Sequence, residues 1–74
     1  MRFNREATKA IRERSKITQT ALSADAGIDR ANYSNIEAGN RRPTDAQMVA
    51  IAKALVVPLS AIATLDENEA QVAA

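Results

Sequence analysis

Apolar residues recur every three or four positions through most of the chain, and no stretch alternates apolar and polar residues with the two-residue period of a strand. Such spacing places the apolar side chains on one face of a helix. The two glycines and two prolines fall between the periodic segments, where they would begin or end helices. The pattern therefore predicts an all-α domain of five helices with no sheet.

The first helix is expected to follow Asn4, whose side chain can cap it, with Glu6 in the first turn, where the helix dipole favours an anion. The stripe with three-four spacing that we expect to face the core consists of Phe3, Ala7, Ala10, Ile11 and Arg14. A second series with the same spacing forms a basic face and consists of Arg2, Arg5, Lys9, Arg12 and Lys16. For most of these cations, solvated surface and phosphate contact are equally good interpretations.

Two short helices joined at a glycine form the centre of the chain. Thr18 is a good N-cap for a helix from Gln19 to Ala26, and Gly27 suits the left-handed residue that would end it. Asp29 caps the next helix, which Gly39 ends in the same way. The residues expected between these helices and in the core are Leu22, Ser23, Ala26, Ile28, Tyr33 and Ile36. A generic helical hairpin needs the apolar positions but not a small residue and a glycine at these offsets, so the spacing favours a helix-turn-helix.

Two further helices are expected after a basic loop. Thr44 and Gln47 form a capping-box pattern for the fourth helix, whose inward residues are Met48, Ile51, Ala52 and Leu55. Pro58 breaks that helix or begins the next, and a short fifth helix is expected from Leu59, Ile62, Ala63 and Leu65. We expect residues 1–66 to form one domain and residues 67–74 to form a flexible tail.

Composition argues against catalysis and against metal or cofactor binding. The chain of 74 residues has no cysteine and no histidine, which removes disulfides, thiolate metal sites, the usual general base and the commonest metal ligand. Its nine acidic residues are scattered, so we expect no enzyme activity, no metal, no cofactor and no small-molecule ligand. No apolar run approaches the roughly 20 residues that span a bilayer, and the N-terminus lacks the apolar segment of a secretory signal, so we expect a soluble, cytoplasmic protein without membrane contact.

The net charge of +1 conceals an asymmetry between the two parts of the chain. Residues 1–44 hold nine Lys or Arg and five Asp or Glu, which gives +4, whereas residues 45–74 hold one Lys and four acids, which gives −3. Such asymmetry suggests a basic face presented to a polyanion, although a chance split on a small surface is the alternative.

The chain resembles the Cro/C1-type (XRE) helix-turn-helix family, which includes the repressors and Cro proteins of lambda-like phages. The matching residues are Ile11-Arg12, Ile17-Thr18-Gln19, Leu22, Ala26-Gly27-Ile28, Tyr33-Ser34-Asn35-Ile36-Glu37-Ala38-Gly39, Arg41-Arg42-Pro43 and a helix ending in Leu55. The resemblance covers residues 5–65 and implies a five-helix, lambda-repressor-like domain that places its third helix in the major groove of double-stranded DNA.

The resemblance also implies roles for individual residues. The base-reading positions of the family fall on Arg30, Ala31 and Asn35, and Asn32 is close enough to share the work. Arg can pair bidentately with guanine, Asn can pair bidentately with adenine, and an alanine methyl can meet a thymine methyl. The positions that contact the DNA backbone correspond to Thr18, Gln19, Arg41 and Arg42.

Arg12 and Glu37 match family positions that form a buried ion pair beneath the recognition helix, which would make Arg12 structural. Several residues depart from the family pattern. Lys16 and Val56 stand where glycine is usual, Ser23 stands where alanine is usual, and Tyr33 stands where an aliphatic residue is usual. A carboxylate at Asp29, at the edge of the expected DNA face, would repel phosphate unless it is occupied as a cap.

The sequence therefore indicates a sequence-specific transcriptional regulator, a Cro-like repressor that occupies a double-stranded operator in the cytoplasm of a bacterial or phage-infected cell. An antitoxin, a restriction-modification controller protein and a protein-interaction module that does not bind DNA are the alternatives. The operator sequence, the choice between repression and activation, and the choice between a monomer and a homodimer, formed through the fifth helix or only on DNA, stay open.

Overall fold

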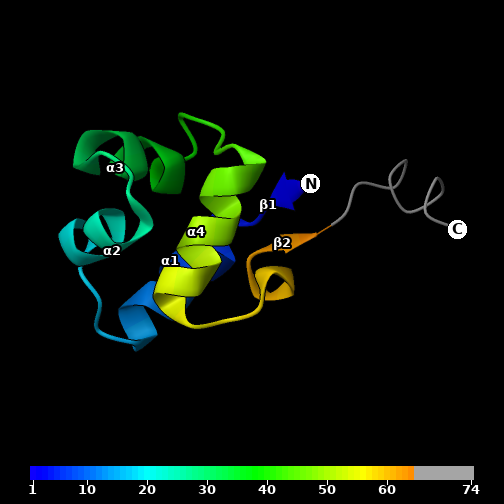
Figure 1. The fold of residues 1–74 in the computed structure, drawn as a ribbon, viewed down its shortest axis with the longest axis horizontal. Helices are drawn as coiled ribbons and strands as arrows, with labels where there is room; N and C mark the ends of the chain where they lie inside the picture. The colour runs from blue at the N-terminus through cyan, green and yellow to red at the C-terminus, as the bar shows by residue number, and fades with distance from the viewer. Residues whose placement is uncertain (65–74) are drawn as a thin grey trace, which may run out of the picture.

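The computed structural model describes residues 1–64 as a bundle of helices closed by a small sheet (Figure 1). In chain order its elements are β1 (Arg2–Phe3), α1 (Arg5–Arg14), α2 (Gln19–Ala26), α3 (Arg30–Ala38), α4 (Asp45–Leu55), the 3-10 helix η1 (Leu59–Ala61) and β2 (Ala63–Thr64). None of the helices in residues 1–64 has the length and apolar character needed to cross a bilayer.

Side-chain caps begin the four α-helices at the residues expected from the sequence. The side chains of Asn4, Thr18 and Asp29 each accept a hydrogen bond from a backbone N–H in the first turn that follows. At the start of α4, the Gln47 backbone N–H donates to Thr44 Oγ1 over 3.1 Å, and the Thr44 N–H donates to Gln47 Oε1 over 2.9 Å. These short-range bonds satisfy N–H groups that the helix itself leaves without a partner, so they fix where each helix starts.

The α-helices end in two different ways. Gly27 and Gly39 follow α2 and α3 with φ of 70° and 87°, which glycine adopts without steric cost. Lys16 and Val56, the two residues that stand where the family has glycine, both have φ of 58°. The chain thus takes the left-handed turn after α1 and α4 as well, but with side chains that disfavour it.

The core lies around α4, which packs against α2 (Figure 1). Helix α1 packs against α3. The apolar side chains that are almost completely buried come from α2, α3, α4 and the residue after η1: Leu22, Tyr33, Ile36, Met48, Ile51 and Ile62. The inward faces expected for the second, third and fourth helices are therefore confirmed, except that Ala26 is only half-buried. Ser23 is buried at the close approach of the helices, where its hydroxyl donates to the Thr20 carbonyl oxygen over 2.9 Å.

The expectation that the chain forms no sheet is wrong. β1 pairs antiparallel with β2, with Arg2 opposite Thr64 and Phe3 opposite Ala63, and the Asn4 N–H donates to the Ile62 carbonyl oxygen over 2.8 Å. Two-residue strands are too short to show the alternation that identifies a strand in a sequence. Their pairing joins the two ends of the described chain, which no local pattern reveals.

The expected fifth helix is not confirmed, because residues 1–64 contain four α-helices. Within residues 1–64 the segment after α4 contains one 3-10 turn, Leu59–Ala61, which Pro58 precedes, and Ala63 already belongs to β2. Ile62 ends the turn at φ of −124°, outside the helical range, which allows the chain to extend into the strand. Leu65 and the tail expected at residues 67–74 lie outside the described residues.

The buried face of α1 also differs from the expected stripe. Ala10 and Arg14 are exposed, whereas Thr8 and Arg12 are buried. Thr8 can be buried because its hydroxyl donates to the Asn4 carbonyl oxygen over 2.9 Å, and Arg12 because it pairs with Glu37. The spacing of apolar residues cannot predict the burial of a polar residue when its hydrogen-bond or ion-pair partner is brought close only by folding.

Candidate nucleic-acid interface

The third helix, α3, has two faces of opposite character. Tyr33, Ile36 and Glu37 point into the protein and are buried. On the other side of the helix Arg30, Ala31, Ser34 and Asn35 are exposed. The exposed set combines a cation, hydrogen-bonding groups and a methyl group, which are the side-chain types that read base edges in the major groove.

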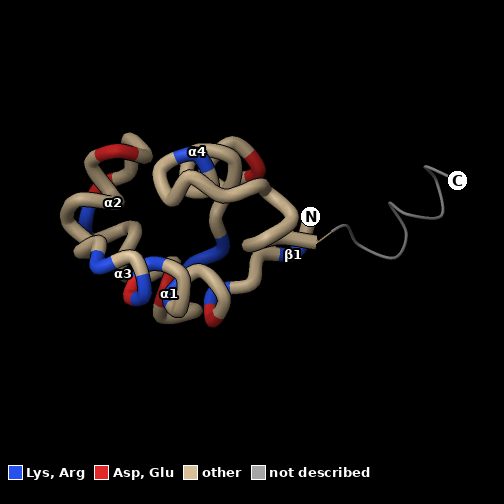
Figure 2. The backbone as a smooth tube through the Cα atoms, turned by 90° about the horizontal axis from the view of Figure 1, so that it is seen from below, with Lys and Arg blue, Asp and Glu red and all other residues tan. Residues whose placement is uncertain are grey.

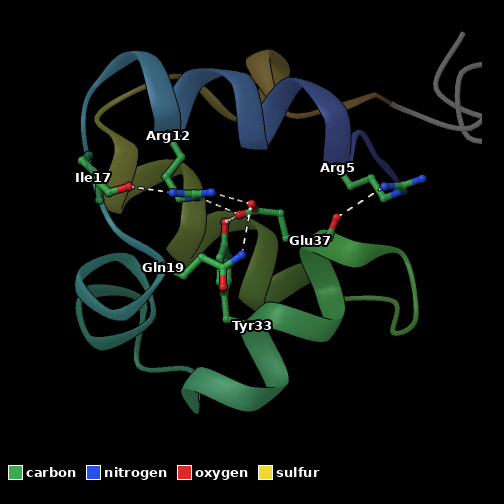
Figure 3. Close-up of polar contacts among 6 residues, drawn as sticks. All are labelled: Arg5, Arg12, Ile17, Gln19, Tyr33 and Glu37. Carbon is green, nitrogen blue, oxygen red and sulfur yellow. Dashed lines mark hydrogen bonds and ion pairs between the residues drawn. The ribbon is translucent and has the colours of Figure 1, made fainter.

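The buried Glu37 carboxylate holds α3 against the rest of the fold (Figure 3). Arg12 from α1 donates to it twice, from Nε to Oε2 over 2.9 Å and from Nη2 to Oε1 over 2.7 Å. Tyr33 Oη donates to Oε2 over 2.6 Å, and Gln19 Nε2 donates to Oε1 over 3.2 Å. One carboxylate thus joins α1, the first residue of α2, and α3.

Arg12 makes a third hydrogen bond to a second partner, since its Nη1 donates to the Ile17 carbonyl oxygen over 2.8 Å. Its guanidinium therefore connects the turn between α1 and α2 to Glu37 on the buried face of α3. The structure thus places Arg12 and Glu37 in direct contact, and it makes Arg12 unavailable to a ligand on the surface. The other members of the expected basic series, Arg2, Arg5, Lys9 and Lys16, are exposed.

The pKa shifts of the three ionisable groups follow from this geometry. Burial by itself would raise the pKa of Glu37, but the hydrogen bonds from Arg12, Tyr33 and Gln19 together with the Arg12 charge outweigh it and lower the pKa below its ordinary value. Burial and then the hydrogen bond to Glu37 raise the pKa of Tyr33. The hydrogen bond to Glu37 raises the pKa of Arg12. All three shifts favour a carboxylate held by a charged guanidinium and a neutral phenol.

The Tyr33 hydroxyl is a member of this network that the sequence analysis missed. Tyr33 was expected only as a core residue in an aliphatic position, yet its hydroxyl makes a short hydrogen bond in the network. A sequence signal was present, because Tyr33 and Glu37 are four residues apart and so lie on the same face of one helix.

Three residues expected at or near the DNA surface already make hydrogen bonds within the protein. Asp29 Oδ2 accepts from the backbone N–H of Ala31 over 3.1 Å and of Asn32 over 3.4 Å, so its carboxylate caps α3. Thr18 is exposed, and its Oγ1 accepts from the Ala21 N–H over 3.0 Å. Gln19 is half-buried and donates to Glu37 through Nε2.

Asn32 differs from the other residues on α3. It is half-buried, and its Oδ1 is buried without a hydrogen-bond partner within the described part of the chain. The oxygen end of this amide therefore points away from the open surface that Arg30, Ala31 and Asn35 share.

Arg41 and Arg42 are exposed in the loop between α3 and α4. The Arg42 Nη2 donates to the Met1 carbonyl oxygen over 2.9 Å, which ties the loop to the N-terminal segment. Figure 2 shows Lys and Arg at α1, α3 and β1. The Arg42–Met1 hydrogen bond brings the cations of this loop close to those of the N-terminal segment.

Comparison with known protein families agrees with this arrangement. A family model described as "Helix-turn-helix" matches residues 9–62, which include α2, α3 and α4 in full. Neither the search of curated proteins nor the search of solved structures found a match.

Proposed function

The chain belongs to the Cro/C1-type (XRE) helix-turn-helix family of DNA-binding regulators, and we propose that it is a sequence-specific repressor that acts, like Cro, by occupying an operator. The observation that carries the proposal is the exposed polar face of α3 fixed over a buried ion-pair network. A helix that recognises bases needs rigid support, because its side chains must already lie in the positions from which they bond to the base edges. Its place of action would be the cytoplasm of a bacterial or phage-infected cell.

In this proposal α3 lies in the major groove of double-stranded DNA. That groove is about 12 Å wide and accepts an α-helix of about 10–12 Å diameter. The Arg30 guanidinium would donate two hydrogen bonds to a guanine, and the Asn35 amide would form two hydrogen bonds with an adenine. The Ala31 methyl would contact a thymine methyl. Asn32 would contribute less, because its oxygen is buried.

Four further residues would hold the DNA backbone. Thr18 and Gln19 stand at the N-terminus of α2, where the helix favours an anion. Arg41 and Arg42 would contact phosphates from the loop that follows α3. Such contacts fix the register of the protein on the duplex and supply salt-dependent affinity without reading sequence.

The test is a binding-site selection with the wild type and with the Arg30→Ala and Asn35→Ala variants. We expect the wild type to bind random duplex at low salt and to select a defined operator. Each variant should lose preference at particular base pairs by about 1 to 3 kcal/mol, because one bidentate pair is removed.

Lys53→Ala is the control, since Lys53 is an exposed cation on α4, away from α3 in sequence. It should leave the selected sequence unchanged. Absence of wild-type binding at low salt would rule out the proposed function, and an unchanged operator in both α3 variants would rule out α3 as the reader.

A further inference from the structure

A cleft of about 660 Å³ opens between the N-terminal segment and the loop that follows α3. Four arginines line it, two from each side: Arg2 and Arg5 from the N-terminal segment, and Arg41 and Arg42 from the loop. Among the described residues that line the cleft, Glu6 is the only acid. The cleft is therefore strongly basic, although the chain as a whole carries a net charge of only +1.

Tertiary contacts fix the N-terminal side of the cleft and join it to the loop and to α3. The β1–β2 pairing sets Arg2 opposite Thr64, and the Arg42 Nη2 donates to the Met1 carbonyl oxygen over 2.9 Å. Arg5 points toward the end of α3, where its Nη1 lies 3.5 Å from the Glu37 carbonyl oxygen (Figure 3). The cleft thus adjoins the C-terminal end of α3, the helix that we propose recognises the bases.

Gly39 permits the approach of Arg5. A Cβ atom at position 39 would lie 2.8 Å from Arg5 Nε, closer than real contacts allow. Glycine there therefore ends α3 and also leaves room for the guanidinium to cross the helix end. Carbonyl groups at a helix C-terminus favour a cation, which helps to keep Arg5 in place.

The four guanidinium groups keep their charges available. Within residues 1–64 none of them pairs with a carboxylate, in contrast to Arg12, which Glu37 occupies. The first turn of α1 also lines the cleft, through Asn4, Arg5 and Glu6, and a helix N-terminus favours an anion. Like charges gathered in this way repel one another, and a bound phosphate would offset the repulsion.

We propose that this cleft binds a backbone phosphate of the DNA, so that Arg2 and Arg5 extend the DNA-binding surface from the helix-turn-helix onto the N-terminal segment. The inference rests on the proposed function, because it takes the DNA to lie along α3 and the loop that carries Arg41 and Arg42. The planar fork of arginine matches the geometry of phosphate. The cleft is also continuous with that loop, so one nucleic-acid strand can reach both.

The test compares Arg2→Ala, Arg5→Ala and the double variant with the Lys53→Ala control on the selected operator. The slope of log K against log salt falls by about 0.9 for each phosphate that the protein no longer neutralises, so loss of the one phosphate in the cleft should lower it by about 0.9 in the double variant. The selected sequence should not change, because phosphate contacts carry no base information. Lys53→Ala should leave the slope as in the wild type.

Ethylation interference locates the contact directly. We expect a phosphate whose ethylation blocks binding of the wild type and no longer affects the Arg5→Ala variant. Thermal unfolding of each variant checks the fold. Arg2→Ala keeps the test decisive if Arg5→Ala unfolds, because Arg2 is exposed on a two-residue strand.

The outcomes separate this inference from the proposed function. If the wild type binds no duplex at low salt, the proposed function fails and the cleft proposal fails with it. If the wild type binds and Arg41→Ala lowers the slope, but the Arg2 and Arg5 variants behave like Lys53→Ala, only the cleft proposal is overturned.

Discussion

At the scale of single residues, Glu37 connects stability to the position of α3. Its carboxylate is buried and accepts hydrogen bonds from Arg12, Tyr33 and Gln19. Taking one partner from such a buried pair is costly, about 3 to 5 kcal/mol, because the remaining charge keeps the cost of its desolvation without its compensation. A variant that removes one partner from the contacts that align α3 should therefore be strongly destabilised.

The Glu37 network predicts a loss of stability in acid. Because the folded protein lowers the pKa of Glu37 below its ordinary value of 4.5, protons bind the unfolded chain more tightly. The stabilisation is complete above that ordinary value and is lost as the pH falls through the lowered pKa. We expect the free energy of unfolding, measured by urea titration from pH 7 to pH 3, to fall at the acidic end of this series.

Glu37→Gln should lower the free energy of unfolding at pH 7 by about 3 to 5 kcal/mol and flatten this acid dependence. Tyr33→Phe, which removes one hydrogen bond to a charged group, should cost about 1.5 to 3 kcal/mol and is the milder variant if Glu37→Gln does not fold. Glu13→Gln is the control, because Glu13 is exposed on α1. An acid dependence that is the same in all four proteins would contradict the assignment to Glu37.

At the scale of elements, the residues that end the α-helices differ in how easily they adopt the left-handed backbone conformation found there. Gly27 and Gly39 take the left-handed conformation freely, whereas Lys16 and Val56 take it with a Cβ atom. Val56 is the less suitable of the two, because it is β-branched, and its side chain is 89% exposed, so little packing compensates the strain.

Replacing Val56 by glycine should therefore stabilise the protein. The left-handed conformation costs an L-residue roughly 1 to 2 kcal/mol, and glycine gives back roughly 0.5 to 1 kcal/mol as extra entropy of the unfolded chain. We expect a net gain of about 0.5 to 1 kcal/mol for Val56→Gly, measured by chemical denaturation. Val56→Ala separates the causes: if it stabilises the protein as much as glycine does, removal of the β-branched side chain rather than the backbone freedom of glycine is the reason.

At the scale of the whole molecule, the described surface offers little for a stable dimer. Its exposed large apolar side chains are Val49 and Val56, and η1 has three residues, too few for a helical ridge. Stable interfaces bury about 800 Å² from each partner, mostly around apolar anchors. We therefore propose that two copies pair only on DNA.

Sedimentation velocity at several concentrations, with and without the selected operator, tests this pairing. The free protein should sediment as a monomer, and two copies should bind an operator whose half-sites are about 34 to 36 Å apart. A dimer at micromolar concentration without DNA would contradict the proposal. A single copy on a duplex with two half-sites would contradict pairing altogether.

The sequence by itself determined where the four α-helices of residues 1–64 begin. Asn4, Thr18, Asp29 and Thr44 cap their helices through bonds to the next three residues, and Gly27 allows the turn between α2 and α3. These interactions join residues that are close in the sequence, so the sequence alone can predict them. The resemblance to the Cro/C1-type family rests on the same local residues, and the family match confirms it.

Only the tertiary structure decided which faces and which distant segments meet. Thr8 and Arg12 are buried because their partners lie inside the fold, and β1 pairs with a strand about sixty residues away in the sequence. The arginine cleft has the same origin, since Arg5 and Gly39 meet only when α1 packs against the end of α3. Contacts between residues far apart in the chain leave no periodic signal, because their spacing is set by the packing of whole elements.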